Sequence, residues 1–216
     1  LGLYVALCLL VWALLRRFAR AAGAASPGDD HLAGAAALLF AAHPTHAEVV
    51  ASLANRPELL ALLCTLAVTW LLLQIRLGRA RPATAAWATL AFAGGLASKE
   101  SAIGALAAWG IWAASARSRV LVRPLAAMAL VALAWLGWRW SMLGAVTSLG
   151  VPPADNPLAI EPAGIRVLNA LALVWRAATH LVWPSDLAPD YTFAAWPVLR
   201  QITAEAVAGA VLVLSV

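Results

Sequence analysis

The sequence is poor in charged residues. Only 12% of its 216 residues are Asp, Glu, Lys or Arg, and the mean hydropathy is +0.84. A typical soluble domain carries about 25% charged residues, so this composition excludes an ordinary soluble enzyme. An intrinsically disordered chain is excluded as well, because disorder requires low hydrophobicity and 63% of these residues are hydrophobic.

Cysteine is also scarce. The two cysteines, Cys8 and Cys64, both lie inside apolar runs. We therefore predict that they are small buried hydrophobic residues, and that they form neither a disulfide nor a metal site.

Several patterns of known enzyme classes are missing. The sequence has no P-loop, no GxGxxG, no GxSxG and no CxxC. It also lacks an internal repeat of roughly 20–50 residues, which argues against a solenoid. Alternation of apolar and polar residues with a period of two is absent too, which argues against a transmembrane β-barrel.

What the sequence does contain is a series of apolar runs. They cover residues 1–15, 32–42, 59–73, 83–97, 101–116, 124–138, 165–183 and 204–216. At roughly 20 residues per crossing, the length allows about six membrane spans. We predict an all-α, polytopic helical membrane protein in which residues 1–216 form a single transmembrane domain. Because the sequence begins and ends inside apolar runs and does not begin with Met, we expect it to be part of a longer protein, truncated at both ends.

Basic residues are concentrated in alternate polar stretches. Three such stretches hold nine of the fifteen Lys and Arg residues, namely Arg16, Arg17, Arg20, Arg76, Arg79, Arg81, Arg117, Arg119 and Arg123. The positive-inside rule places these stretches in the cytoplasm. This orientation accounts for the net charge of +5, so we predict no nucleic-acid partner. The other stretches then face the periplasm of a bacterial inner membrane, or the lumen of the endoplasmic reticulum.

The first candidate segment for chemistry surrounds Pro44. Because proline fixes its own φ and disfavours helix at the preceding His43, we expect one helix to end there and a short helix or turn to begin near Thr45. Glu48 lies three residues after Thr45, which predicts a capping box.

The polar residues of this segment admit two interpretations. They are His43, His46, Glu48, Asn55 and Arg56. One interpretation is a helix cap with polar residues at the membrane surface; the other is the wall of a polar pocket. His43, His46 and Glu48 do not have the spacing of a known zinc site, so no metal ligand is predicted. A divalent metal is left open, and no other cofactor is predicted.

The second candidate segment is Ser98-Lys99-Glu100. As a helix, the preceding run 83–97 would be about 22 Å long, less than the ~30 Å hydrocarbon core. The turn should therefore lie at or below the membrane surface, where charges are costly unless they pair or line a wet cavity. Adjacent helical residues do not face each other, so we expect different partners for Lys99 and Glu100. The alternative is a hairpin loop with solvated charges.

Gly94 and Gly95 precede this turn, and small residues of this kind let another helix approach closely.

A Pro-rich stretch carries Asp155 and Asn156. Its three prolines predict a fixed, non-helical loop, which is either functional or a plain surface connector. Farther on, Asp190 and Tyr191 follow an interfacial Trp, which suggests a surface site or an anchor.

Arginine also occurs within the apolar run 165–183. Arg176 would lie near the middle of this run if it crossed the membrane, which costs several kcal/mol on insertion scales. A helix in the interface, or along a cavity, is easier to reconcile with this position. Arg166 and Arg176 could then bind a lipid phosphate.

Four segments, taken in order, resemble the motifs of one membrane family. They are His43-Pro44-Thr45-His46-Ala47-Glu48-Val49-Val50 with Asn55-Arg56-Pro57-Glu58-Leu59-Leu60-Ala61; Ser98-Lys99-Glu100-Ser101; Asp155-Asn156-Pro157; and Trp183-Pro184 followed by Leu187 and Asp190-Tyr191. The family is that of the transmembrane and tetratricopeptide-repeat protein O-mannosyltransferases and their bacterial relatives. The resemblance covers about residues 32–196.

The resemblance implies a GT-C glycosyltransferase fold. Such an enzyme transfers a sugar, typically mannose, from a polyprenyl-phosphate donor to a Ser or Thr hydroxyl of a protein acceptor on the non-cytoplasmic side, with inversion. The partners implied are therefore the lipid bilayer, the polyprenyl-phosphate sugar donor and the protein acceptor. In this family the key acidic residue belongs to the first outer loop, which would precede this sequence. We accordingly expect the base in that loop and name no residue of this sequence as catalytic.

On this resemblance we expect the listed motif residues to line the donor–acceptor pocket: His43, His46, Glu48, Asn55, Arg56, Lys99, Glu100, Asp155, Asn156, Asp190 and Tyr191. We expect the donor phosphate to be bound by Lys99, Arg166 or Arg176. Two alternatives stay open. One is a secondary transporter with a Lys99–Glu100 coupling site, which would predict a hydropathy repeat; the other is a non-enzymatic membrane scaffold.

Overall fold

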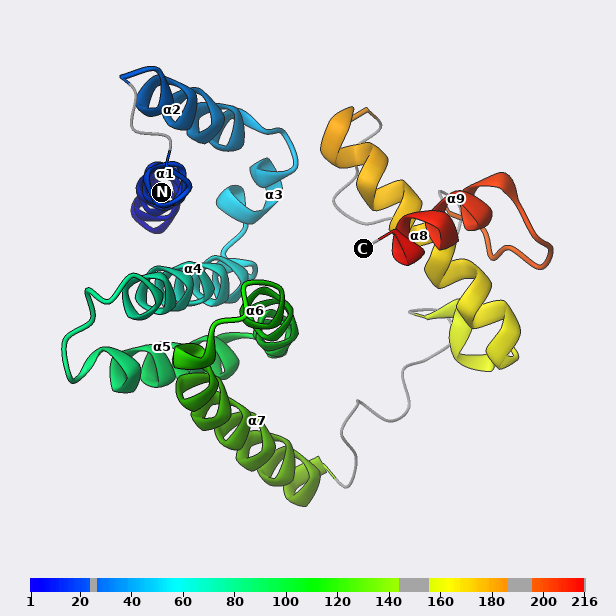
Figure 1. The fold of residues 1–216 in the computed structure, drawn as a ribbon. Coiled ribbons are helices and arrows are strands. Elements are labelled where there is room, and N and C mark those ends of the chain that lie inside the picture. The colour runs from blue at the N-terminus through cyan, green and yellow to red at the C-terminus, as the bar shows by residue number, and fades with distance from the viewer. Residues whose placement is uncertain (24–26, 144–155, 186–195, 216) are drawn as a thin grey trace. The chain divides into compact units, whose positions relative to one another are not determined.

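The computed structural model describes residues 1–23, 27–143, 156–185 and 196–215, and every regular element in these ranges is a helix (Figure 1). The elements are α1 (Gly2–Ala21), α2 (Pro27–Ala42), α3 (His46–Ala51), α4 (Arg56–Arg76), α5 (Thr84–Ser98), η1 (Glu100–Ile103), α6 (Gly104–Ser115), η2 (Arg119–Leu121), α7 (Val122–Leu143), η3 (Pro157–Ile160), α8 (Ala163–Val182) and α9 (Ala204–Leu214). The all-α prediction is confirmed, and each predicted apolar run contains a helix.

Contacts divide the chain into two compact units, Leu1–Val146 and Thr147–Val216. The first unit contains α1 to α7, and the second contains η3, α8 and α9. The single transmembrane domain stays a prediction.

Four helices within the described residues are long and apolar enough to cross a membrane. They are α1, α4, α8 and the segment Arg119–Met142, which includes most of α7. These helices indicate a multi-pass membrane protein. By contrast, α2, α5 and α6 have 16, 15 and 12 residues, fewer than the ~20 that a full crossing requires.

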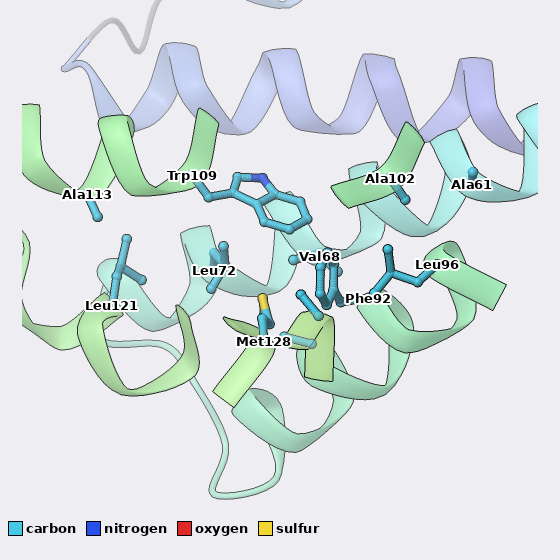
Figure 2. Packing of buried hydrophobic residues seen from close by; sticks show 12 residues of the cluster. Ala61, Val68, Leu72, Phe92, Leu96, Ala102, Trp109, Ala113, Leu121 and Met128 are labelled. Carbon is cyan, nitrogen blue, oxygen red and sulfur yellow. The ribbon is translucent and has the colours of Figure 1, made fainter. Parts of the chain in front are cut away.

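The core of the first unit lies between α4, α5, α6 and α7. Its buried members are Ala61, Val68, Leu72, Ala88, Phe92, Leu96, Ala102, Trp109, Ala113, Leu121, Met128 and Ala132. Figure 2 shows the Trp109 ring directed into this cluster, and the ring centroid of Phe92 lies 5.9 Å away at an edge-to-face angle. The Trp109 indole donates to the Thr69 hydroxyl at 3.0 Å, which satisfies a polar group that would be costly to leave unpaired in the core.

α5 packs closely on α4 at Gly95. A Cβ atom built on Gly95 would lie 3.3 Å from the Cβ of Cys64 and 3.4 Å from the Cβ of Ala102. The prediction that the Gly94-Gly95 pair permits close helix approach is therefore confirmed. Cys8 and Cys64 are free thiols, as predicted, but both are only partly buried. The predicted burial is therefore only partial for both residues.

The C-terminal ends of α1, α4 and α6 lie together at one end of the first unit. Arg17 of α1 donates to Gln74 of α4 at 2.5 Å, and Arg76 at the end of α4 lies over the Trp112 ring of α6. We call this the arginine end; its basic residues are Arg16, Arg17, Arg20, Arg76, Arg79, Arg81, Arg117, Arg119 and Arg123. The alternate stretches predicted to share one side of the membrane therefore lie at one end of the first unit.

In the second unit, α8 and α9 pack with almost no space between their backbones. A Cβ atom on Gly209 would clash with the backbone oxygen of Leu171, so only glycine fits at this contact. Asn169 of α8 holds the following chain as well: its amide nitrogen donates to the Leu199 carbonyl at 2.8 Å, and its amide oxygen accepts from the Leu199 amide at 2.9 Å.

Candidate functional site

A cavity of about 530 Å³ lies at the end of the first unit opposite the arginine end. Its walls come from α1, α3, α4, η1 and α6, with Asn55 of the turn before α4, and they carry both polar and apolar side chains. The lining residues are Tyr4, Leu7, His46, Glu48, Val49, Asn55, Glu58, Leu59, Ala61, Leu62, Thr65, Ser101, Ala102 and Ala105. We call this region the His46 end, and it includes Lys99, which pairs with the lining residue Glu58.

The chain turns at Pro44, as its sequence predicts. The helix α2 ends at Ala42 and α3 begins at His46. The predicted capping box, however, is wrong. Thr45 already has helical backbone angles, φ −61° and ψ −19°, rather than the extended conformation that lets an N-cap side chain reach the first turn. Its hydroxyl instead lies 2.7 Å from His43 Nδ1.

Glu48 contacts a different partner from the one that a capping box requires. Its carboxylate accepts a hydrogen bond from the Asn55 amide at 3.0 Å. Glu48 and Asn55 lie on opposite sides of the turn between α3 and α4, and both line the cavity. This bond therefore orients a solvent-accessible carboxylate at the cavity wall.

Tyr4 links α1 to the turn after α2. Its hydroxyl lies 2.9 Å from the Ala41 carbonyl and 2.9 Å from His46 Nδ1. Because a hydroxyl has one hydrogen and two lone pairs, it can satisfy both atoms at once. The Ala41 carbonyl is one of those that a helix C-terminus leaves without an intrahelical donor. Tyr4 was missed by the sequence analysis, because a tyrosine inside an apolar run gives no signal of its partner.

His46 lies between aromatic rings in a partly buried position. Its ring centroid is 4.4 Å from that of Phe40 and 5.7 Å from that of Tyr4. Burial lowers the pKa of His46, the Phe40 backbone carbonyl opposes this shift, and the neighbouring His43 adds to it. At neutral pH the imidazole is therefore uncharged, with one donor and one acceptor nitrogen.

Glu58 and Lys99 form an ion pair at 2.5 Å. It joins the first turn of α4 to the turn between α5 and η1. The hydrogen bond with Glu58 is the main cause that raises the pKa of Lys99, so the ammonium is charged at neutral pH. Both side chains are 39% exposed, which leaves them accessible to a ligand. Glu58 was not among the predicted site residues, although its place in the Arg56 segment could have indicated it.

The Lys99–Glu58 pair shows which partner Lys99 of the Ser98-Lys99-Glu100 turn contacts. Lys99 contacts Glu58 rather than its neighbour Glu100, as expected for adjacent residues. Glu100 and Arg56 are exposed and lie beside the described lining of the cavity rather than in it. Of the predicted pocket residues, the structure brings His46, Glu48 and Asn55 to the cavity wall, with Lys99 and His43 next to it.

The remaining predicted residues belong to the second unit. Asn156 precedes η3, and its side chain accepts from the Leu158 amide at 3.1 Å, so it acts there as a helix cap. Arg166 is exposed on α8. Asp155, Asp190 and Tyr191 lie outside the described residues.

Arg176 has an ionic partner on the neighbouring helix. Two of its guanidinium nitrogens donate to one Glu205 oxygen of α9, at 3.0 and 2.7 Å, and the guanidinium lies 5.2 Å from the Trp196 ring centroid. This pairing offsets the cost of an arginine near the middle of α8. Binding of a donor phosphate by Arg176 stays a prediction.

The two histidines of the Pro44 turn lie close to each other. His43 and His46 have ring centroids 5.9 Å apart, and the described residues contain no group of three His, Cys, Asp or Glu side chains arranged to hold a metal ion. The side chains in and next to the described cavity offer hydrogen bonding and ion pairing. Carboxylate and amide groups can bind hydroxyls, and the lysine can bind an anion.

No family model, no curated protein and no solved structure matches the chain.

Proposed function

We propose that the chain contains the donor–acceptor pocket of a GT-C type glycosyltransferase, which transfers a sugar from a polyprenyl phosphate to a protein Ser or Thr hydroxyl. Mannose is the proposed sugar, on the motif resemblance. The observation that carries the proposal is the juxtaposition at the His46 end: hydroxyl-binding groups and an accessible cation surround one cavity at the end of a bundle of membrane-spanning helices.

The cavity offers the two kinds of contact that this reaction needs. Sugar and acceptor hydroxyls require carboxylate and amide partners, which Glu48 and Asn55 supply as a hydrogen-bonded pair. The departing lipid phosphate requires a positive charge. Lys99 supplies it by exchanging its Glu58 partner for the phosphate, which its exposure permits.

Orientation supports the same assignment. The arginine end faces the cytoplasm if the positive-inside rule holds. The His46 end then faces the periplasm or the lumen, where sugars carried on polyprenyl phosphates are transferred. We assign the general base to none of these residues, because in the family that the motifs resemble that role belongs to the first outer loop and not to these motifs.

The test is transfer of labelled mannose from a polyprenyl-phosphate donor to a Ser/Thr peptide by the full-length protein in membranes. Glu48→Gln should lower the transfer rate by roughly a factor of 10² or more, as expected for a lost contact to the reacting groups. Arg79→Gln, at the arginine end, should leave it unchanged. Absence of transfer by the unaltered protein would refute the proposal.

A further inference from the structure

A second cavity, a groove of about 750 Å³, lies between α6 and α7 at the arginine end. Its walls are apolar, and many of the residues that form them are small: Gly110, Ala113 and Ala114 of α6, with Ala126 and Ala129 of α7. Arg117, Ser118 and Arg119 also line it, and they belong to the turn that connects the two helices. The groove is therefore an apolar channel with two cations at one end.

Both cations are available to a ligand. Arg117 and Arg119 are exposed, and neither forms an ion pair within the described residues. At the same end of the bundle, Arg16 and Arg20 share the carboxylate of Asp30. Asp30 thus neutralises Arg16 and Arg20. Among the described residues, no carboxylate forms an ion pair with Arg117 or Arg119 in the same way.

The backbone at Arg117 is strained. Its φ is +48°, in the left-handed region that favours glycine. The turn after α4 has the same hydrogen-bond pattern: Gly78 bonds the Ile75 carbonyl and the next amide bonds Gln74, just as Arg117 bonds Ala114 and the next amide bonds Ala113. This is the helix-ending pattern that glycine normally completes.

Glycine has the left-handed conformation at two other helix ends of the described chain. Gly23 after α1 and Gly78 after α4 have φ values of +87° and +67°. After α6, at the same end of the unit, Arg117 occupies the corresponding position and adopts a backbone conformation that is unfavourable for a residue with a side chain. An arginine in this place contributes its charge to the mouth of the groove.

We propose that this groove binds an anionic phospholipid of the bilayer, with the phosphate between Arg117 and Arg119 and an acyl chain along the small residues of α6 and α7. A lipid without net charge would leave the two arginines without an ionic partner. A water-soluble anion would leave the apolar walls of the groove uncovered. α7 belongs to a segment of membrane-spanning length, so phospholipid is the amphiphile present at this position. The site is separate from the His46 end and does not depend on glycosyl transfer.

Native mass spectrometry of the full chain in detergent tests the site, with phosphatidylglycerol and phosphatidylcholine as probes. The unaltered chain should retain phosphatidylglycerol in preference to phosphatidylcholine. The double variant Arg117→Gln/Arg119→Gln should bind phosphatidylglycerol roughly thirtyfold more weakly, because each basic residue at a lipid surface contributes about a factor of five. The matched control is Arg79→Gln/Arg81→Gln, which removes two exposed charges outside the groove and should retain the lipid. Equal loss in the control would overturn the proposal, because the attraction would then be a general effect of surface charge.

The groove itself is tested by Gly110→Leu, which leaves all charges in place. A side chain at Gly110 meets open space, with no atom within 4 Å of a built Cβ, so the variant should fold and fill the groove. Phosphatidylglycerol binding should fall, whereas glycerol phosphate added in excess should not displace the lipid from the unaltered chain. Unchanged lipid binding in Gly110→Leu, or displacement by glycerol phosphate, would contradict an acyl-chain site.

The variant Arg117→Gly distinguishes the effect of the Arg117 charge on lipid binding from its effect on stability. Glycine relieves the positive φ, so the thermal midpoint should rise or stay level while lipid binding falls roughly fivefold. A variant with raised stability and full lipid retention would show that Arg117 does not bind the headgroup.

Discussion

The two ends of the first unit both carry charge, but they use it differently. At the arginine end, cations rest on aromatic rings: Arg17 lies over Trp70, and Arg76 lies over Trp112. At the His46 end, the charged and polar side chains come from several elements and surround a cavity of about 530 Å³.

This difference indicates that the arginine end orients the protein in the membrane, whereas the His46 end binds a ligand. Arginines stacked on tryptophan at the ends of long apolar helices are suited to anchoring those ends at a membrane surface. Polar groups arranged around an open cavity add little to the fold, because an exposed ion pair contributes at most about 1 kcal/mol. We infer that the charged side chains of the His46 end bind a ligand rather than stabilise the fold. The following substitutions test this contrast between the two ends.

The largest effect on stability should come from neither end but from the core between them. Trp109→Ala removes a 5% exposed ring and its hydrogen bond to Thr69. We expect a loss of about 3 kcal/mol, at the lower end of the range for soluble cores, because helix association in lipid depends on packing rather than on removal from water. The free energy of unfolding in mixed detergent micelles measures it. A loss no greater than that of a surface variant would contradict the described core.

The next effect concerns the link between α1 and α2 at each end. Tyr4→Phe removes the hydroxyl that contacts Ala41 and His46, and we expect it to cost about 1 kcal/mol of unfolding free energy. Asp30→Asn weakens the ion pairs with Arg16 and Arg20 at the other end. Because that carboxylate is exposed, Asp30→Asn should cost less than Tyr4→Phe in the same assay. The reverse order would contradict the contrast drawn between the two ends.

The smallest effect should be a dependence of stability on pH. Burial lowers the pKa of His46 in the folded state, so the unfolded chain takes up this proton at a higher pH than the folded chain does. The contribution of His46 to stability is therefore complete above about pH 6.5, the ordinary histidine value. It is lost as the pH falls through the lowered folded pKa. His46→Gln should flatten the unfolding free energy between pH 7 and pH 5, within roughly the range where histidine titrates. If the unfolding free energy of His46→Gln depended on pH as steeply as that of the unaltered chain, His46 would not be the source of this pH dependence.

The helices were predictable from the sequence because each is encoded locally. An apolar run bounded by arginine or proline predicts a helix regardless of its neighbours, although only some of these helices have membrane-spanning length. Pro44 alone placed the break between α2 and α3. The pairing of Arg176 was not predictable, since its partner Glu205 follows 29 residues later.

The candidate site was predictable only where its residues cluster in sequence. His46, Glu48 and Asn55 lie within one short segment, and the sequence indicated them together. Tyr4 joins the site through a contact between α1 and the turn after α2, and no spacing rule connects positions so far apart in the sequence. Thr45 shows the opposite failure: the capping-box pattern was present, but the helical backbone at that residue prevented the cap.

The most direct test of the central inference compares stability and transfer in a single variant, Lys99→Gln, which keeps a polar side chain but removes the positive charge next to the cavity. Because the Lys99–Glu58 pair is exposed, we expect the unfolding free energy to change by less than about 1 kcal/mol. Sugar transfer from the polyprenyl-phosphate donor, measured on the same preparation of the full-length protein, should fall by roughly a factor of 10²–10³. Full transfer activity in Lys99→Gln would contradict the inference that the ions of the His46 end serve chemistry.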